Sequence, residues 1–358
     1  YNNKRVLYSE VIRMSGVAGE GCEILVPFNE RRPLAEIERS LVKTYRKQVW
    51  SKFIKAIKDY KLVEEGDKIA IAISGGKDSL IMAKLFQELK KHGQINFELV
   101  FLAMDPGYHP QIRELLEDNC KYLDIPVHIY DSGIFQVVDK IAKDYPCYMC
   151  ARMRRGSLYG KAKELGCNKL ALGHHFNDVI ETTMLNVLYA GNFKTMLPKL
   201  KAANFDGIEL IRPLYYIEEK YIKRWIQRAG IWPLNCACMV AAKKIGNKRF
   251  EIKDMIEEFK EKFDGVDKSI FRAAQNVSVD SILGWDIDGE HYSYLDFYDE
   301  ESLLNSTAEL KQKGLVNEAV AYERQNIARN LIGLLDDEVI AEKTGLSLKE
   351  IKSMQIDN

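Results

Sequence analysis

The chain has 358 residues, of which 46% are hydrophobic and 29% charged, a composition ordinary for a soluble globular protein. Its 52 basic and 52 acidic residues give a formal net charge of zero, so a nucleic-acid partner would need a local basic face. No uncharged apolar run approaches the roughly 18 residues that span a bilayer, and the first residues lack the apolar core of a signal peptide. Together with seven cysteines, an odd number, this predicts a cytoplasmic protein that does not enter the membrane.

Residues 1–34 show no regular pattern and are predicted to form an irregular N-terminal extension. From residue 34 to about residue 60, apolar side chains recur at helical spacing, which predicts one long amphipathic helix. Lysines and arginines load the opposite face of this helix. Such a pattern is typical of a solvated surface, and contact with RNA is the alternative.

The segment Ser74-Gly75-Gly76-Lys77-Asp78-Ser79 follows an apolar run that predicts a buried parallel strand at residues 69–73. The glycines permit a tight turn close to a ligand, and the helix that follows presents its positive end to an anion. The common phosphate loop G-x-x-x-x-G-K-[ST] is absent. The pattern SGGxDS is instead typical of enzymes that cleave ATP between its α and β phosphates, and a plain glycine turn is the alternative.

Strands and helices then alternate. Strands are predicted near residues 97–104, 127–130 and 169–173, and helices near residues 110–123, 151–165 and 177–189. This order predicts an α/β fold with a doubly wound parallel sheet, in which ligands bind at the carboxyl ends of the strands. The glycine loop and the segment Gly173-His174-His175 should therefore face one crevice.

The character of the sequence changes after residue 288, where an aromatic and acidic segment precedes further helices. We expect a helical C-terminal extension over residues 289–358. Residues 336–351 resemble a short helix-turn-helix, which we interpret as a packing or dimerisation module rather than a reader of DNA. The central domain would then span residues 35–288.

Two cysteine clusters indicate a metal or redox site. Cys147 and Cys150 form a C-x-x-C pair beside a run of arginines, and Cys236 and Cys238 follow much later in the chain. Four thiolates could bind structural zinc, and three could hold a [4Fe-4S] cluster with one iron open. A redox dithiol is the third interpretation. Cys120 and Cys167 lie in apolar or helical surroundings and are interpreted as core thiols; Cys22 has no chemical interpretation.

The order of SGGKDS, residues 146–156, residues 172–178, residues 211–214 and the last cysteines resembles the tRNA 2-thiocytidine synthetase family. It is similar, more distantly, to the tRNA 2-thiouridine synthetases. The likeness covers about residues 36–285 and implies the PP-loop fold of the adenine nucleotide alpha hydrolase type. It also implies an ATP-dependent tRNA sulfurtransferase that uses ATP, Mg²⁺ and a [4Fe-4S] cluster. ATP would adenylate the carbonyl oxygen of a pyrimidine, with an anticodon-loop cytidine as the expected target, and sulfide on the open iron would displace AMP.

The resemblance also implies roles for single residues. Those expected to hold the pyrophosphate are Ser74, Gly75, Gly76, Asp78 and Ser79, with Lys77 as a helper. Met104 would hold adenine through its backbone, and Gly173 and Asp178 would face the nucleotide, with Asp178 a candidate partner of Mg²⁺. Cys147, Cys150 and Cys238 would bind the cluster, and Cys236 is the alternative third ligand.

The expected partners are tRNA and a sulfur donor, either a cysteine desulfurase or free sulfide, and a homodimer is allowed. Residues proposed to contact the RNA backbone are Lys194, Lys199, Lys201, Lys220, Lys223, Arg224 and Arg228. Three alternatives stay open: a persulfide on the cysteines without iron, adenylation of a small molecule or peptide, and a binding protein that is not an enzyme.

Overall fold

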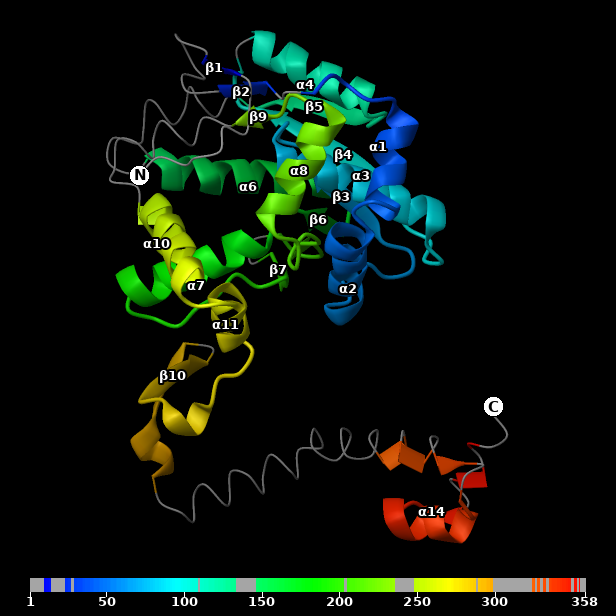
Figure 1. The fold of residues 1–358 in the computed structure, drawn as a ribbon. Helices are drawn as coiled ribbons and strands as arrows, with labels where there is room; N and C mark the ends of the chain where they lie inside the picture. Colours follow the sequence, from blue (N-terminus) through cyan, green and yellow to red (C-terminus); the bar gives the residue numbers. More distant parts are fainter. Residues whose placement is uncertain are drawn as a thin grey trace. The chain divides into compact units, whose positions relative to one another are not determined.

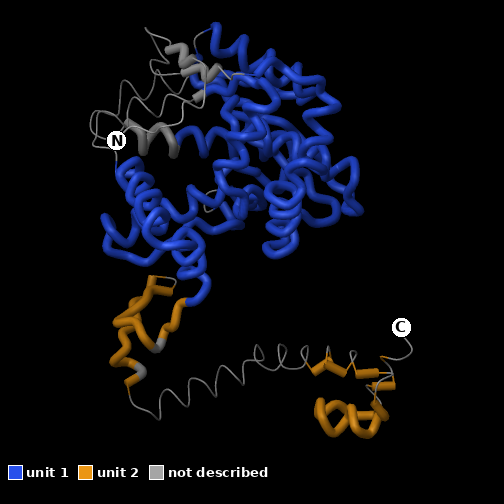
Figure 2. The backbone as a smooth tube through the Cα atoms, viewed as in Figure 1, with its two compact units in different colours: residues 1–276 blue, residues 277–358 orange. Residues whose placement is uncertain are grey.

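A computed structural model describes residues 10–13, 23–26, 29–108, 110–132, 146–202, 205–235, 248–287, 289–298, 324–325, 327–328, 331–332, 335–348, 351–352 and 354. The chain forms two compact units, Tyr1–Asn276 and Val277–Asn358, which are considered separately (Figure 2). This division falls ahead of the boundary expected at residue 288, and the domain limits stay a prediction. None of the described helices is both long and apolar enough to cross a membrane.

The first unit is built on a six-stranded sheet whose strand order is β5-β4-β3-β6-β8-β7 (Figure 1). The strands are β3 (Lys68–Ala72), β4 (Glu98–Asp105), β5 (Val127–Asp131), β6 (Lys169–Ala171), β7 (Lys199–Lys201) and β8 (Glu209–Ile211). All pairings are parallel except that of β7 with β8. The chain runs outward from β3 to β5 and then returns to the other side of β3. The predicted doubly wound α/β fold is therefore confirmed, with its switch point between β3 and β6.

Alternate residues of each strand enter cores on opposite faces of the sheet, as the period of two requires. Ile69 and Ile71 belong to the larger core, and Ala70 belongs to the smaller one. The larger core contains residues from α1 (Leu34–Val42), η1 (Arg46–Trp50), α2 (Ser51–Asp59), α3 (Lys77–His92), α4 (Pro110–Tyr122), α7 (Phe176–Tyr189), α8 (Glu219–Ala229), α10 (Lys248–Lys262) and α11 (Val266–Ala273). Among the described helices, only α6 (Pro146–Glu164) packs in the smaller core.

The single helix predicted for residues 34–60 is wrong, because three pieces replace it: α1, the π-helix η1 and α2. The N–H of Tyr45 donates to the carbonyl of Ser40 at 2.8 Å, and that of Trp50 donates to the carbonyl of Tyr45 at 3.3 Å. Each bond joins residue i to residue i−5 instead of residue i−4, so the turns are wider than in an α-helix. The helix axis is interrupted, yet Leu41 and Phe53 are both fully buried.

Two other predictions are corrected. Residues 1–34 are not wholly irregular, because β1 (Glu10–Arg13) and β2 (Glu23–Val26) form an antiparallel sheet with β9 (Leu234–Asn235). The helix predicted near residues 151–165 begins earlier, because α6 starts at Pro146 and its first turn contains Cys147 and Cys150.

The second unit contains the antiparallel hairpin β10 (Gly284–Ile287) and β11 (Glu290–Ser293), flanked by short 3₁₀ helices η2 (Val279–Ser281) and η3 (Tyr294–Phe297). Near the C-terminus, α14 (Asp337–Thr344) ends at Gly345, whose φ of 70° is left-handed. Ile340 packs with Ala328 and Ile351 in a small core. The second helix of the predicted helix-turn-helix falls only partly within the described residues.

A buried ion pair joins Lys169, the first residue of β6, to Asp67, which precedes β3. Its removal should greatly lower the stability of the fold. The Lys169 side chain is 2% exposed, and its ammonium lies 2.6 Å from Asp67. Replacing Lys169 by Met leaves the buried Asp67 carboxylate without this cation, so Lys169→Met should lower the free energy of unfolding by about 3–5 kcal/mol. Lys199 is the matched control. Both Lys169 and Lys199 pair with Glu64, but the Lys199 side chain is 24% exposed. Lys199→Met should cost about 0–1 kcal/mol, and equal losses in urea titrations would contradict the assignment.

Candidate nucleotide-binding site

The glycine loop joins β3 to α3, and its tight turn requires glycine. Gly75 has a left-handed φ of +75°, and a Cβ there would lie 2.6 Å from Leu234 Cδ1. A Cβ on Gly76 would lie 3.3 Å from the carbonyl oxygen of Leu234. The N–H of Leu234 donates to the Gly75 carbonyl at 2.9 Å. The loop is thus fixed against the chain that leads to the second cysteine cluster.

The two serines of the motif brace the loop from within. Ser79 Oγ donates to the carbonyl of Gly76 at 2.9 Å and accepts the N–H of Ser74 at 3.2 Å. The N–H of Gly76 reaches Ser74 Oγ at 3.4 Å. Gly76 caps α3, so the first turn of this helix directs its backbone N–H groups to the end of β3. Such a helix start favours a bound anion.

The loop after β6 lies directly against this turn. A Cβ on Gly173 would approach both Cβ and the carbonyl carbon of Asp78 to 3.2 Å. Only a residue without a side chain allows this contact without a shift of its neighbours. The two loops follow adjacent parallel strands, and the structure therefore brings Gly173 together with the SGGKDS segment, as the sequence predicted.

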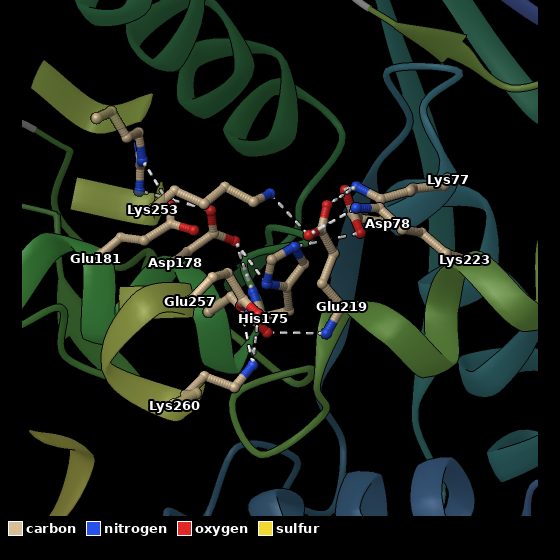
Figure 3. Close-up of polar contacts among 12 residues, drawn as sticks. Lys77, Asp78, His175, Asp178, Glu181, Glu219, Lys223, Lys253, Glu257 and Lys260 are labelled. Carbon is tan, nitrogen blue, oxygen red and sulfur yellow. Dashed lines mark hydrogen bonds and ion pairs between the residues drawn. The ribbon is translucent and has the colours of Figure 1, made fainter. Parts of the chain in front are cut away.

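Three lysines converge on the carboxylate of Glu219, the first residue of α8 (Figure 3). Lys77 lies 3.2 Å from its Oε1, and Lys223 and Lys253 lie 2.9 Å and 2.8 Å from its Oε2. Lys77 also contacts Asp78 Oδ2 at 2.9 Å. The lysines come from α3, α8 and α10, and all five side chains are at most 33% exposed. We call Lys77, Lys223 and Lys253 the lysine cluster.

The charges of this group shift one another's pKa values. Burial opposes ionisation of Glu219, but Lys77, Lys253 and Lys223 outweigh it and hold the pKa of Glu219 far below its ordinary value. Burial also opposes the charge on Lys77, yet Asp78 and Glu219 raise its pKa. For Lys223, burial dominates and the pKa is lowered. Three cations against two carboxylates leave net positive charge in a poorly solvated place, which suits a polyanion.

A second polar group lies at the start of α7. His175 caps this helix, and Asp178 Oδ2 accepts the His175 N–H at 2.9 Å. Arg249 of α10 lies 3.5 Å from Asp178 Oδ1 and donates to Glu181 at 3.1 Å. Burial would raise the pKa of Asp178, but His175, His174 and Arg249 lower it, so the carboxylate is ionised at neutral pH. His175 thus acts in the cap of α7.

His174 and Asp78 each carry a buried polar atom that has no hydrogen-bond partner among the described residues. These atoms are His174 Nδ1 and Asp78 Oδ1. Burial lowers the pKa of His174 to about 4, so its ring is neutral near pH 7. No three described His, Cys, Asp or Glu residues gather as a ready metal site. Asp178 and Asp78 carry carboxylate oxygens, the ligands that a hard cation such as Mg²⁺ prefers.

Met104 lies at the same edge of the sheet, next to the end of β4. Its side chain is 5% exposed and packs with Tyr130 and Met153. The following residue, Asp105, accepts the N–H groups of Gly107 and Tyr108 at 2.8 Å and 2.7 Å and so holds the turn after the strand. Asp105 was missed in the sequence, although an acidic residue ending a buried strand is a visible signal.

The cysteines are located only through their backbone neighbours. Side chains of Cys147 and Cys150 lie outside the described residues, as do Cys236 and Cys238 altogether. Met153 contacts Met104 at the carboxyl end of β4, whereas Ala162 packs in the core nearer the middle of the sheet. Hence α6 runs antiparallel to the strands, and Cys147 precedes Met153 by roughly 9 Å along the helix axis. Convergence of three sulfurs stays a prediction.

The sequence analysis did not identify Glu219 and Lys253 as site residues. Several lysines that were expected to contact RNA form ion pairs with carboxylates of the protein. Lys223 binds Glu219, Lys220 lies 2.5 Å from Glu218, and Lys199 lies 3.0 Å from Glu209. The i,i+4 spacing of Glu219 and Lys223 was visible in the sequence, but their direction toward the loop depends on how α8 packs.

Comparison with known proteins agrees with this geometry. A family model described as a PP-loop domain matches residues 42–233. The tRNA-cytidine(32) 2-sulfurtransferase of Pelobacter propionicus is 35% identical over 237 residues, which cover 66% of this chain and 87% of that protein. The protein of the same name from Shewanella woodyi is 34% identical over 295 residues, 81% of this chain and 88% of that protein.

Among solved structures, the U34-tRNA thiolase of Methanococcus maripaludis, with its [4Fe-4S] cluster, has the same fold, with a TM-score of 0.52 and 24% identity. The match covers 66% of this chain and 78% of the thiolase. On the sequence matches, the chain belongs to the PP-loop family and, within it, to the tRNA 2-thiocytidine synthetase family.

Proposed function

We propose that this protein is a tRNA sulfurtransferase that uses ATP to replace the 2-oxygen of an anticodon-loop cytidine by sulfur. Family membership supports the reaction class, since relatives at about 35% identity bear the name tRNA-cytidine(32) 2-sulfurtransferase. The observation that carries the proposal is the meeting of the glycine loop with the lysine cluster at one sheet edge. We further propose that Cys147 and Cys150, in the first turn of α6, lie near this edge.

The first step is transfer of the adenylyl group. The base oxygen attacks the α-phosphorus, a bond between them forms, and the bond to the pyrophosphate breaks. Backbone N–H groups at the start of α3 and the lysine cluster bind the leaving pyrophosphate and stabilise its growing charge. Asp78 would act on the pyrophosphate through a cation, because its carboxylate accepts a hydrogen bond from Lys77 and orients that lysine. Asp178 is the residue that would hold Mg²⁺.

The second step replaces the activated oxygen. Sulfur attacks C2 of the base, and AMP leaves with the former base oxygen. Sulfide enters and a phosphate ester leaves, so no oxidant or reductant is needed. When bound by Cys147, Cys150 and Cys238, a [4Fe-4S] cluster would supply an open iron that holds sulfide. The target base must leave its stack to reach this edge, which suits a single-stranded loop. We place the reaction in the cytoplasm, with a cysteine desulfurase or free sulfide as sulfur source.

The lysine cluster can be tested by its preference for pyrophosphate. Lys223→Met and Lys253→Met should each weaken ATP binding by about tenfold or more, because a charge-assisted hydrogen bond contributes roughly 1.5–3 kcal/mol. AMP binding should change little, since AMP lacks the β and γ phosphates. Calorimetric titration with ATP, AMP and pyrophosphate measures this.

The matched control lies on the same helix. Lys260 of α10 pairs with Glu257 at 2.9 Å, away from Glu219. Lys260→Met should leave all three affinities unchanged. Equal affinity of wild type and the two cluster variants for ATP would remove the lysines from the phosphate site.

The cysteine assignment predicts which substitutions remove iron. Cys147→Ser, Cys150→Ser and Cys238→Ser should abolish iron content and visible absorbance after anaerobic purification, and tRNA thiolation with them. Cys120→Ser and Cys167→Ser should retain both, because these thiols are buried in the core and burial raises the pKa of Cys120 to about 12. If Cys236→Ser loses iron and Cys238→Ser keeps it, the third ligand is reassigned. A colourless wild type that still thiolates tRNA contradicts the cluster.

The reaction itself is tested with purified protein, ATP, Mg²⁺, sulfide and unmodified tRNA. Mass spectrometry of the digested nucleosides should show 2-thiocytidine and an equal amount of AMP. Omitting ATP should abolish both products. A different thionucleoside would change the target base, and AMP formed without any thionucleoside would contradict sulfur transfer.

A further inference from the structure

The outer stripe of α8 carries a row of cations that the nucleotide site does not use. Tyr221, Arg224 and Arg228 are spaced by three and four residues, so they lie on one side of the helix. Both arginines are exposed, while Trp225 and Ile226 on another side are buried. Glu219 and Lys223, which face the lysine cluster, occupy a third side. One helix therefore presents different residues to the core, to the nucleotide site and to solvent.

The Tyr221 ring is surrounded by cations. Lys220 Nζ lies 5.0 Å from its centroid, Arg224 Cζ 5.7 Å and Lys52 Nζ 6.0 Å. Glu218 partly neutralises the two lysines, since it pairs with both. An aromatic ring among cations is the arrangement on which unpaired bases stack while the backbone is held.

At its other end the stripe enters a basic pocket. The pocket has a volume of about 320 Å³ and lies between α1 and the end of α8, with Arg32, Arg39, Lys43 and Arg228 in its wall. Glu36 is the one carboxylate of the lining, and it lies 3.6 Å from Arg32. For Arg39, Lys43 and Arg228, no ion pair occurs within the described part of the chain. The pocket thus gathers four cations against one anion.

A rigid backbone marks the pocket as a built feature. Beside it, burial raises the pKa of Tyr45, and the charges of Arg228, Arg224 and Arg32 oppose this shift. The N–H of Arg32 donates to the carbonyl of Ala229 at 3.1 Å. A Cβ on Gly230 would clash with the backbone carbonyl of Glu30. The segment that carries Arg32 is therefore fixed on the end of α8.

We propose that the stripe Tyr221-Arg224-Arg228 and the pocket beyond it form a track for the RNA backbone on the side of α8 that faces away from Glu219. This inference rests on the proposed function, because it names where that tRNA lies. The Tyr221 ring among these cations favours RNA over an acidic protein, because an unpaired base can stack on it while the arginines bind phosphates. The track follows α8 for roughly 11 Å on the side opposite Glu219, so it binds the tRNA away from the adenylation site.

The test compares tRNA affinity in variants of three exposed arginines and of the half-buried Tyr221. Arg224→Ala, Arg228→Ala and Arg39→Ala should each raise the Kd for unmodified tRNA by about tenfold, with the salt slope reduced by roughly one for each phosphate that the variant no longer binds. Tyr221→Leu should weaken binding with an unchanged salt slope, because it removes stacking and no charge. Affinity for ATP should stay at the wild-type value throughout, which also shows that the variants are folded.

Lys121→Ala and Lys163→Ala are the matched controls, because both lysines are exposed on other helices and no ion pair is found for them in the described residues. They should bind tRNA as the wild type does. Variants of the track that bind tRNA normally overturn the track but leave the proposed function intact. Normal tRNA binding with loss of thiolation only when a cysteine desulfurase supplies the sulfur would reassign the surface to that protein. A wild type that binds no tRNA overturns the proposed function as well.

Discussion

The carboxylate of Glu219 holds together three ammonium groups that would otherwise repel one another. Two unit charges about 5 Å apart at an effective dielectric of about 20 repel by roughly 3 kcal/mol, so the cluster needs an anion at its centre. Glu219 supplies one, and Lys77, Lys223 and Lys253 bring α3, α8 and α10 to it. Each of these helices adjoins a functional segment: the glycine loop, the chain toward Leu234, and the stretch that follows the cysteines. A triphosphate can compete with Glu219 because it offers the same lysines more negative charge.

Features encoded locally could be predicted from the sequence. SGGKDS specifies its turn within six residues, and the alternation of apolar runs with amphipathic segments specifies a doubly wound sheet. The contact between Gly173 and Asp78 could also be predicted from the sequence. The two residues lie in the segments that follow β6 and β3, and these strands are neighbours in the sheet. The three-residue strands β7 and β8 were missed, whereas β6, equally short, was predicted because its apolar run continues toward Gly173.

Features that depend on packing could not be predicted. The π-helix at residues 46–50 keeps the apolar period of a helix while shifting its register, so the sequence alone indicates one continuous helix. Glu219 and Lys253 are far apart in sequence, and their contact depends on the rotation of α8 and α10 about their axes. Packing also decides which basic residues form ion pairs within the protein and which remain available to a partner. Lys199 and Lys223 form ion pairs, whereas Arg224 and Arg228 remain exposed, and composition does not distinguish them.

The hydrogen bond between Leu234 and Gly75 has a consequence for the second cysteine cluster. Cys236 and Cys238 follow Leu234 by two and four residues. An extended chain advances at most about 3.6 Å per residue, so their Cα atoms lie within about 7 Å and 14 Å of the Leu234 Cα. A tether this short gives either thiol a high effective concentration at the glycine loop, whatever path the intervening chain takes.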